Sequence, residues 1–515
     1  MYQKLIANAV FGVAMVAMSG CALSSAGDDQ TSEQSATLGA NATTQPGGAI
    51  PVTLKPGVHD PGVRGGNPGA GKPVSGLDAN QTAMFNEGKF RVEEFEATCD
   101  GCANITIGQP IPPGGDPNFD ANSAGAGARY NSNSCNIGCH SQPDIGGTAT
   151  AVNQSFFAAQ FRGATNKVPF FETINGPTRE VRFLFNPDGT RDGGVHQKFT
   201  VKGRVDAPDC TAIEQPDFDG NKDNMSFRIP LALFGLGLID ALQDKEIIAN
   251  HDATAFERGK LGIRGVTNNS PNDGTISRFG WKAQNKSITQ FAGEAYNIEV
   301  GITNDLDPTS KTEDDQCNLA TEPADMIHTN NGTPTDPTDN FNQPVHVIPV
   351  WMSFMMFMRH LDQPKAATLG VSAQRGRQIF QDIGCADCHT PHMHTKAGEL
   401  GTFVPQLRDV DVNLFSDLLL HDMGGRLADN IIQGNAGPDM FRTTPLWGIG
   451  QRLFFIHDGR STTLDDAILQ HYSDPTAANG RTPAYPASEA NQVVLNFGAL
   501  DAQGQQDLLN FLRRL

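Results

Sequence analysis

Apolar residues recur along the chain with a helical period in its C-terminal part and with a strand period in its middle part. The stretches "TLDDAILQH" (463–471) and "DLLNFLRRL" (507–515) place apolar residues at i, i+3 and i+4, the spacing of one helical face. By contrast, "EVRFLF" (180–185) and "HQKFTVKGRV" (196–205) alternate apolar and polar residues on either side of the turn-forming "NPDGTRDGG" (186–194). The patterns predict amphipathic helices near the C-terminus and β-hairpin structure in the middle.

The first residues have the pattern of an export signal. Lys4 precedes an apolar run from Leu5 to Met18, and small residues follow before Cys21. The run is too short to span a membrane. Met-Ser-Gly-Cys resembles a bacterial lipobox, which implies cleavage after a signal peptide of residues 1–20 and lipidation of Cys21. The alternative is ordinary cleavage nearby, which leaves a soluble periplasmic protein.

Residues 21–77 contain few large apolar side chains, so we expect a flexible tether that holds the protein to the periplasmic face of the outer membrane. No other membrane contact is predicted. The remaining chain is long enough for two or three domains, since the protein has 515 residues. A net charge of −19 argues against binding to nucleic acid. Acidity suits a basic partner such as a small electron-donor cytochrome, although solubility alone would also explain it.

Nine cysteines divide into groups with different chemistry. Cys385-Ala-Asp-Cys388-His389 has the spacing with which two thiols attach one haem and the next histidine binds its iron. Gly376 and Phe380 stand one helical turn apart just before this motif, as in the first helix of a cytochrome c, whose last helix packs against the first. A redox or zinc Cys-x-x-Cys is the alternative, but it lacks a second pair of ligands.

Four other cysteines are expected to form disulfides in an oxidising compartment. The sequence leaves the connectivity open; Cys210–Cys317 with Cys99–Cys102 is the arrangement we expect. A redox-active Cys99–Cys102 pair is the alternative. Cys135-Asn-Ile-Gly-Cys139-His140 is one residue longer than a usual haem-attachment motif.

Several longer segments resemble known di-haem proteins. "MFRTTPLWGIGQRLFFIHDGRSTTLDDAILQHYSDP" (440–475) resembles the C-terminal haem domain of bacterial di-haem cytochrome c peroxidases. Three further segments are similar to the related di-haem oxidoreductases, which are also described as peroxidases or thiol oxidoreductases: "LLLHDMGGRLAD" (418–429), "RFGWKAQ" (278–284) and "FRIPLALFGLGLIDAL" (227–242). The resemblance extends over residues 78–515.

This resemblance implies a mainly α protein with two cytochrome-c-like haem domains, residues 78–345 and 346–515. A β-containing insertion of about residues 155–275 belongs to the first domain. The resemblance also implies two covalently bound haem c groups, and it allows a structural calcium ion. The first haem is expected at Cys135, Cys139 and His140, because the extra residue bulges the loop but leaves both thioether bonds possible.

The expected iron ligands differ between the two haems. The resemblance implies His471 as the second axial ligand of the C-terminal haem, with His421, Met423 and Met440 as alternatives. His457 is expected to order that pocket through hydrogen bonds. The first haem has no firm distal ligand, since His196 is only a weak candidate.

The resemblance further implies catalytic residues at the first haem. Laid against the peroxidases, Trp281 falls between the two haems, Glu299 matches the acid/base residue, and Gln290 approximates a distal glutamine with a one-residue slip. We therefore expect an exported oxidoreductase that reduces hydrogen peroxide, or uses it to oxidise a substrate, with electrons relayed through the C-terminal haem. The alternatives are a non-enzymatic di-haem electron carrier and a thiol oxidoreductase.

Overall fold

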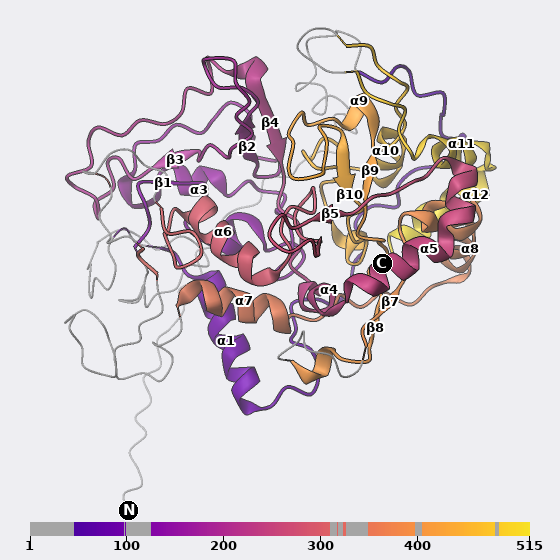
Figure 1. Ribbon diagram of the computed structural model, residues 1–515, viewed down its shortest axis with the longest axis horizontal. Helices are drawn as coiled ribbons and strands as arrows, with labels where there is room; N and C mark the ends of the chain where they lie inside the picture. The colour runs from indigo at the N-terminus through magenta and orange to yellow at the C-terminus, as the bar shows by residue number, and fades with distance from the viewer. Residues whose placement is uncertain are drawn as a thin grey trace, which may run out of the picture. The chain divides into compact units, whose positions relative to one another are not determined.

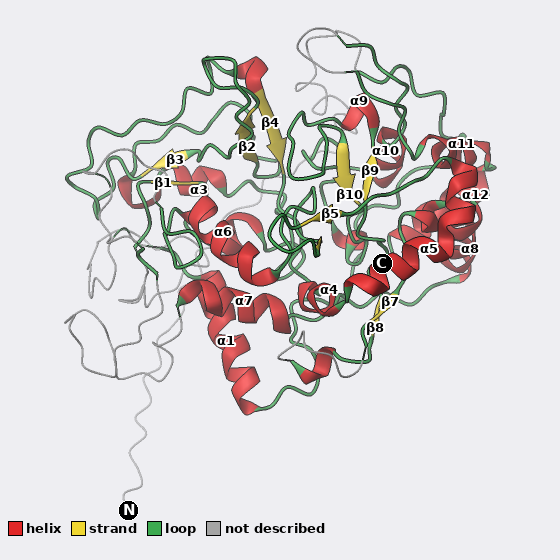
Figure 2. Cartoon of the chain, viewed as in Figure 1, coloured by secondary structure: helices red, strands yellow, loops and turns green. Residues whose placement is uncertain are grey.

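The computed structural model describes residues 46–96, 98, 125–309, 317, 323–325, 349–396, 404–478 and 484–515. The described residues from Pro46 onward belong to one folded unit. Helices and long connecting loops dominate this unit, and its strands form small two-stranded sheets (Figures 1 and 2). Within the described ranges, no helix has the length and apolarity needed to cross a membrane. Because most of the regular structure in the described part is helical, the mainly α prediction is confirmed.

The α-helices of the described part are α1 Ala79–Glu93, α2 Cys135–Cys139, α3 Ser155–Ala159, α4 Leu236–Ala241, α5 Asp244–Leu261, α6 Ile288–Val300, α7 Val350–His360, α8 Val371–Asp382, α9 Gly424–Leu427, α10 Leu464–Gln470, α11 Asn491–Ala499 and α12 Ala502–Leu512. The short 3-10 helices are η1 Phe161–Gly163, η2 Lys222–Asn224, η3 Cys385–Asp387, η4 Pro405–Leu407 and η5 Ile449–Gln451. The strands are β1 Arg129–Tyr130, β2 Glu180–Phe183, β3 Phe199–Thr200, β4 Met225–Arg228, β5 Asn268–Asn269, β6 Ile276–Ser277, β7 Met393–His394, β8 Asp411–Val412, β9 Leu420–Asp422 and β10 Met440–Arg442.

Two pairs of helices cross at a glycine. Helix α1 packs against α7, and α8 packs against α12 (Figure 1). A Cβ atom on Gly88 of α1 would lie 2.2 Å from the carbonyl oxygen of Ser353, and one on Gly376 of α8 would lie 1.9 Å from that of Asp507. Only glycine allows backbones to approach so closely. The packing of the Gly376 helix against the C-terminal helix agrees with the sequence prediction.

Helix α7 belongs with the N-terminal part of the protein. Its residues Phe354, Phe357 and Met358 are buried in one core with Phe85 of α1 and Tyr296 of α6. In Figure 1 it lies beside α1 and α6, far along the sequence from both. Helix α7, which follows the expected boundary at residue 346, therefore packs with helices that precede it. The boundary itself stays a prediction.

The β structure of the predicted insertion is paired differently from the expected hairpin. Strand β2 pairs antiparallel with β4, and β3 pairs with β1. On its other side β2 has isolated bridges, Arg182–Val195 and Phe185–Arg191, and a backbone hydrogen bond from His196 to Val181 (3.0 Å), so the expected hairpin forms only in part. The pairing with β4 is favoured because Phe183 and Phe227 then pack together around the buried Phe171 and Val181. Helix α5, also within the insertion, extends to η3 and β7 in the C-terminal part.

The described part of the predicted tether contains residues that pack against the C-terminal helices. Val52 is 7% exposed and lies in the core beneath α8 and α12. Asp60 accepts a hydrogen bond from Nε of Arg513 (2.7 Å) and another from the backbone N–H of Leu464 (2.7 Å). A flexible tether can therefore include only residues before this packed segment.

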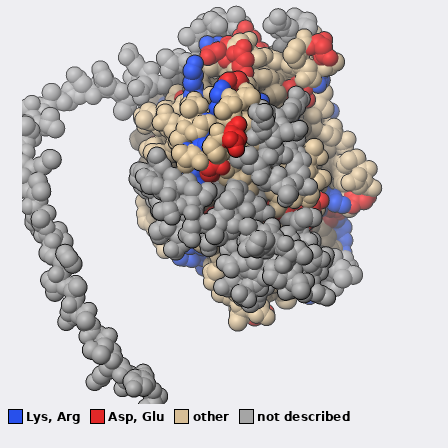
Figure 3. Space-filling model, turned by 90° about the vertical axis from the view of Figure 1, so that its left-hand side faces the viewer, with Lys and Arg blue, Asp and Glu red and all other residues tan. Residues whose placement is uncertain are grey.

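Cys210 and Cys317 form a disulfide, as expected. Cys21, Cys99 and Cys102 lie outside the described residues. On the face shown in Figure 3, acidic and basic side chains of the described part lie next to one another rather than in one large patch.

Candidate haem sites

One cavity is built around Cys385, Cys388 and His389. After helix α8, Gly384 adopts a φ of +97° and turns the chain into the 3-10 helix η3. Because a 3-10 helix has about three residues per turn, residues three apart lie on the same side. Both cysteines and His389 line the cavity, which we call the second cavity. The expected attachment residues of the C-terminal haem therefore share one wall.

Of the four histidines that line this second cavity, His389 and His471 each have the ring held by a backbone carbonyl. The Nδ1–H of His389 donates to the carbonyl oxygen of Phe415 (3.0 Å), and that of His471 donates to the carbonyl oxygen of Ala467 (2.7 Å). Such bonds fix the ring tautomer and leave Nε2 with a lone pair, as in metal-binding histidines. Burial lowers the pKa of His389 to about 4 and also lowers the pKa of His471. Both rings are therefore neutral, which iron coordination requires.

The remaining wall of the second cavity suits a haem. It is largely apolar, with Phe380, Leu464, Ile468, Val494, Phe497, Leu508 and Leu512 among its residues. The buried Arg442 and the half-buried Arg452 also line it, and desolvation lowers the pKa of each to about 10. Nη2 of Arg452 has no hydrogen-bond partner. Haem carries two propionates, and an unsatisfied buried cation is a suitable partner for a carboxylate.

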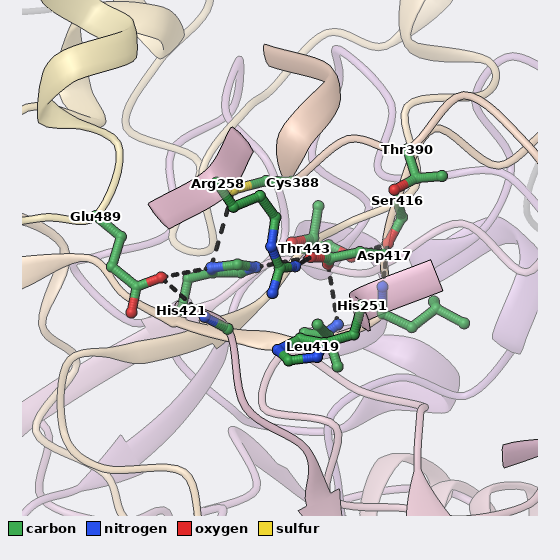
Figure 4. Close-up of polar contacts among 12 residues, drawn as sticks. His251, Arg258, Cys388, Thr390, Ser416, Asp417, Leu419, His421, Thr443 and Glu489 are labelled. Atoms are coloured by element: carbon green, nitrogen blue, oxygen red, sulfur yellow. Dashed lines mark hydrogen bonds and ion pairs between the residues drawn. The ribbon is translucent and has the colours of Figure 1, made fainter. Parts of the chain in front are cut away.

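His421, which the sequence offered as a possible iron ligand, is not available for iron. Its Nδ1–H donates to Glu489 (2.7 Å) and its Nε2–H donates to Asp417 (3.0 Å), so both ring nitrogens are used. Figure 4 shows the ring between the two carboxylates, with Arg258 and Cys388 beside it. Burial opposes a charge on His421, but the adjacent negative groups prevail and raise its pKa well above the usual value.

The two methionines considered as iron ligands lie differently around the second cavity. Met423 lines it, whereas Met440 is not part of the lining. His457 lines it too, and its ring stacks on Phe441 with the ring centres 4.5 Å apart. Among these candidates for the second ligand, His471 is the one whose ring is held by a hydrogen bond at Nδ1 with Nε2 left free.

The first cavity contains Cys135, Cys139 and His140 and explains how a longer attachment loop can work. The segment Cys135–Cys139 is one turn of α-helix, α2, in place of the 3-10 turn at the second cavity. Residues four apart in an α-helix lie on the same face. The extra residue is therefore absorbed by a change of helix type, and both cysteines line the same cavity. The Nδ1–H of His140 donates to the carbonyl oxygen of Gly147 (3.1 Å).

Glu299 lies on the wall of the first cavity, on helix α6. Nδ2 of Asn131 donates to its carboxyl group (2.9 Å). Burial, together with the negative charge of Glu180, raises the pKa of Glu299 to about 7. A carboxyl group with this pKa can accept or release a proton near neutral pH.

Gln290 is not in this site, which corrects the expected catalytic role. It is exposed on the first turn of α6, where its backbone N–H donates to the side chain of Ser287. At about 100° per residue, the interval from Gln290 to Glu299 places the two side chains on opposite faces of the helix. Phe291 and Gln284 line the cavity in its place.

His196 is not in the first cavity either. Its Nε2 bonds to Asp192 (2.9 Å), and its ring stacks on Phe183 with centres 3.9 Å apart. Among the described residues that line the first cavity, His140 is the only histidine.

Trp281 lines both cavities. Its Nε1–H donates to the carbonyl oxygen of Ile229 (2.9 Å), which fixes the ring, and only 9% of the residue is exposed. The ring of His457 meets it edge-on at 6.3 Å, and the guanidinium of Arg452 lies 5.9 Å from its centre. The indole therefore connects the two cavities.

Strands β2 and β4 place three charged residues in the first cavity that were not predicted from the sequence, Glu180, Arg182 and Arg228. A signal was present, since Glu180 and Arg182 alternate with Val181 and Phe183 in a predicted strand. The apolar pair identifies the face that packs in a core, but only the fold shows that the opposite face meets a cavity.

No group of three or more His, Cys, Asp or Glu side chains is arranged to hold a metal ion in the part of the chain that the structure describes. The calcium ion that the resemblance allows has no side-chain cluster there.

Two cavities, each with two cysteines and a histidine on its wall, are what a di-haem protein needs. The family model described as "Di-haem oxidoreductase, putative peroxidase" matches residues 187–497, more than half of the chain. The chain belongs to this family. The matched range contains Cys385, Cys388 and His389 and begins after His140. No curated protein matches the sequence.

Three solved structures are similar to parts of the chain. Hydrazine synthase of Kuenenia stuttgartiensis is 20% identical, with a TM-score of 0.20 over 34% of this chain and 56% of that one. A MauG-like protein associated with microbial copper homeostasis is 20% identical, with a TM-score of 0.22 over 32% and 52%. The di-haem peroxidase BthA of Burkholderia thailandensis is 14% identical, with a TM-score of 0.25 over 46% and 65%. The chain thus spans less than two thirds of each of these proteins.

Proposed function

We propose that the protein is an exported di-haem c oxidoreductase of peroxidase type, with one cytochrome-c-like domain around each cavity. Hydrogen peroxide would be reduced, or used to oxidise a substrate, at the first cavity. The observation that carries the proposal is the difference between the cavities. The second has two neutral imidazoles, His389 and His471, facing it. The first has His140 and, in place of a second imidazole, the titratable Glu299.

The residues of this chain would hold the two haems in different ways. Cys135 and Cys139 would attach the first, with His140 as its iron ligand. Cys385 and Cys388 would attach the second, with His389 and His471 as its iron ligands. When bound, the haems supply electron storage and, at the first iron, a position for peroxide.

Reduction of hydrogen peroxide to two water molecules consumes two protons and two electrons. Glu299 is suited to move a proton between the two peroxide oxygens, because its pKa is raised to about 7. Electrons from a small redox protein would enter at the second cavity. Trp281 provides the connection to the first, since its ring lines both.

Location and partner also belong to the proposal. A signal peptide of residues 1–20 and lipidation of Cys21 would anchor the protein at the outer membrane, facing the periplasm. The net charge of −19 suits a basic electron donor such as a small cytochrome.

Peroxide kinetics of the mature holoprotein, with a small-molecule or cytochrome electron donor, test the proposal. We expect turnover that falls by about a factor of 10²–10⁴ in Glu299→Gln while both haems stay bound. Absence of peroxide turnover in the wild type would favour the electron carrier. A Cys99→Ser variant that loses activity would instead favour the thiol oxidoreductase.

A further inference from the structure

A second carboxyl group from the insertion lies beside Glu299. Glu180, on strand β2, lines the first cavity, and its side chain is hydrogen-bonded to that of Glu299. Nε of Arg182 donates to Glu180 (2.6 Å), and Arg228 is its partner in the β2–β4 register. Strand β2 thus brings a carboxylate with its own cations to the acid/base residue of helix α6.

Two carboxyl groups in hydrogen-bond contact cannot both ionise without strong repulsion, so such a pair holds one proton over a wide pH range. Here the environments of the two groups differ. Burial opposes ionisation of Glu180, but Arg182 and Arg228 outweigh it and lower its pKa. Glu299 has the neutral Asn131 as its hydrogen-bond donor, and its pKa is raised. These surroundings favour the shared proton on Glu299.

The other charged groups around the pair are neutralised locally. Lys198 is bonded to Glu172 (2.6 Å), and both are buried. Arg228 is also bonded to Asp429 (2.7 Å), so its positive charge acts on that carboxylate as well as on Glu180. From helix α6 itself, Glu294 accepts a hydrogen bond from Nδ2 of Asn285 (2.5 Å). These contacts leave Glu180 as the anion that acts most directly on Glu299.

We propose that Glu180 is a positioning residue that holds a proton on Glu299, so that the insertion contributes half of a proton-sharing carboxyl pair to the first cavity. The proposal rests on the proposed function and deepens it. Of the two protons that reduction of peroxide to water consumes, the pair carries one and is reprotonated from solvent. The two electrons come from the external donor through the second cavity.

The test is an infrared pH titration of the holoenzyme that follows the carbonyl band of a protonated carboxyl group. Wild type should lose this band near pH 7, and Glu299→Gln should remove it. In Glu180→Gln the midpoint should fall by about one unit or more, because the neighbouring negative charge is gone. Glu180→Asp, which keeps the charge, should retain a raised midpoint. The pH dependence of kcat/KM should shift in the same direction.

Glu294→Gln is the matched control, since it removes a carboxyl group from the same cavity wall but outside the pair. Its midpoint should equal that of wild type. An unchanged midpoint in Glu180→Gln, or an equal shift in Glu294→Gln, would overturn the proposal. If Glu180→Gln fails to take up haem, a wild-type midpoint below pH 5 would overturn it equally. A shifted midpoint in an enzyme that does not turn over peroxide would support the pair and refute the peroxidase function.

Discussion

Substitution of Gly376 by alanine tests whether the α8–α12 crossing supports the second cavity. A Cβ at this position would lie 1.9 Å from the carbonyl oxygen of Asp507 and 2.8 Å from Cβ of Phe511. An ordinary contact begins at 3.4 Å, so the backbones would have to separate by 3.4 − 1.9 = 1.5 Å. Phe511 contacts Phe380, which lines the second cavity near His389. The separation should therefore reach the haem site.

The change in unfolding free energy of Gly376→Ala is the sum of an overpacking cost and a gain in helix propensity. Overpacking a well-packed core costs about 1–3 kcal/mol, and the upper end applies because the obstructing atom is backbone. Replacing glycine by alanine within a helix gains up to about 1 kcal/mol. Gly376→Ala should therefore destabilise the protein by about 2 kcal/mol. Gly259→Ala in α5 is the matched control, since nothing lies within 4 Å of a Cβ there, and it should stabilise by up to about 1 kcal/mol.

Guanidinium unfolding of the mature holoproteins, followed by haem absorbance, measures both changes. Gly376→Ala should also alter the electron paramagnetic resonance signal of the low-spin iron, whereas Gly259→Ala should not. The reasoning is refuted if Gly376→Ala is as stable as Gly259→Ala and leaves the signal unchanged.

Three further substitutions probe the connection, the second cavity and the wall of the first. Trp281→Phe should slow electron transfer between the haems without loss of haem; an unchanged stopped-flow rate would exclude the indole as the connection. Arg452→Gln removes a buried positive charge and should lower the reduction potential of the second haem in a spectroelectrochemical titration, so a rise would contradict its assigned position. Lys198→Met leaves the carboxylate of Glu172 buried without its ion pair and should lower the unfolding free energy by about 3–5 kcal/mol. A loss below 1 kcal/mol would show that water reaches this carboxylate.

The sequence predicted best what depends on neighbouring residues. Cys385, Cys388 and His389 follow one another, and Gly376 precedes them by a few helical turns, so a local pattern predicted both the attachment site and the helix crossing. The predicted place of Gln290 in the first cavity was wrong for a local reason as well. Helical periodicity puts its side chain on the opposite face of the helix from Glu299.

Other features depend on contacts distant in sequence. Asp60 is held by Arg513, so a segment poor in apolar residues packs instead of forming a tether. Helix α7 contacts α1 across a long interval of sequence. Glu180 lines the first cavity on strand β2, which pairs with the distant strand β4. No local pattern contains these partners.

Electron paramagnetic resonance of the ferric mature holoprotein, combined with a haem count by pyridine haemochrome, tests the central claim most directly. The difference between the cavities predicts two covalent haems in each chain, one low-spin with two histidine ligands and one high-spin with His140 and an open position. A single haem would contradict the α2 attachment site. Two low-spin haems that both stay low-spin after partial reduction would contradict the peroxidase function and favour an electron carrier.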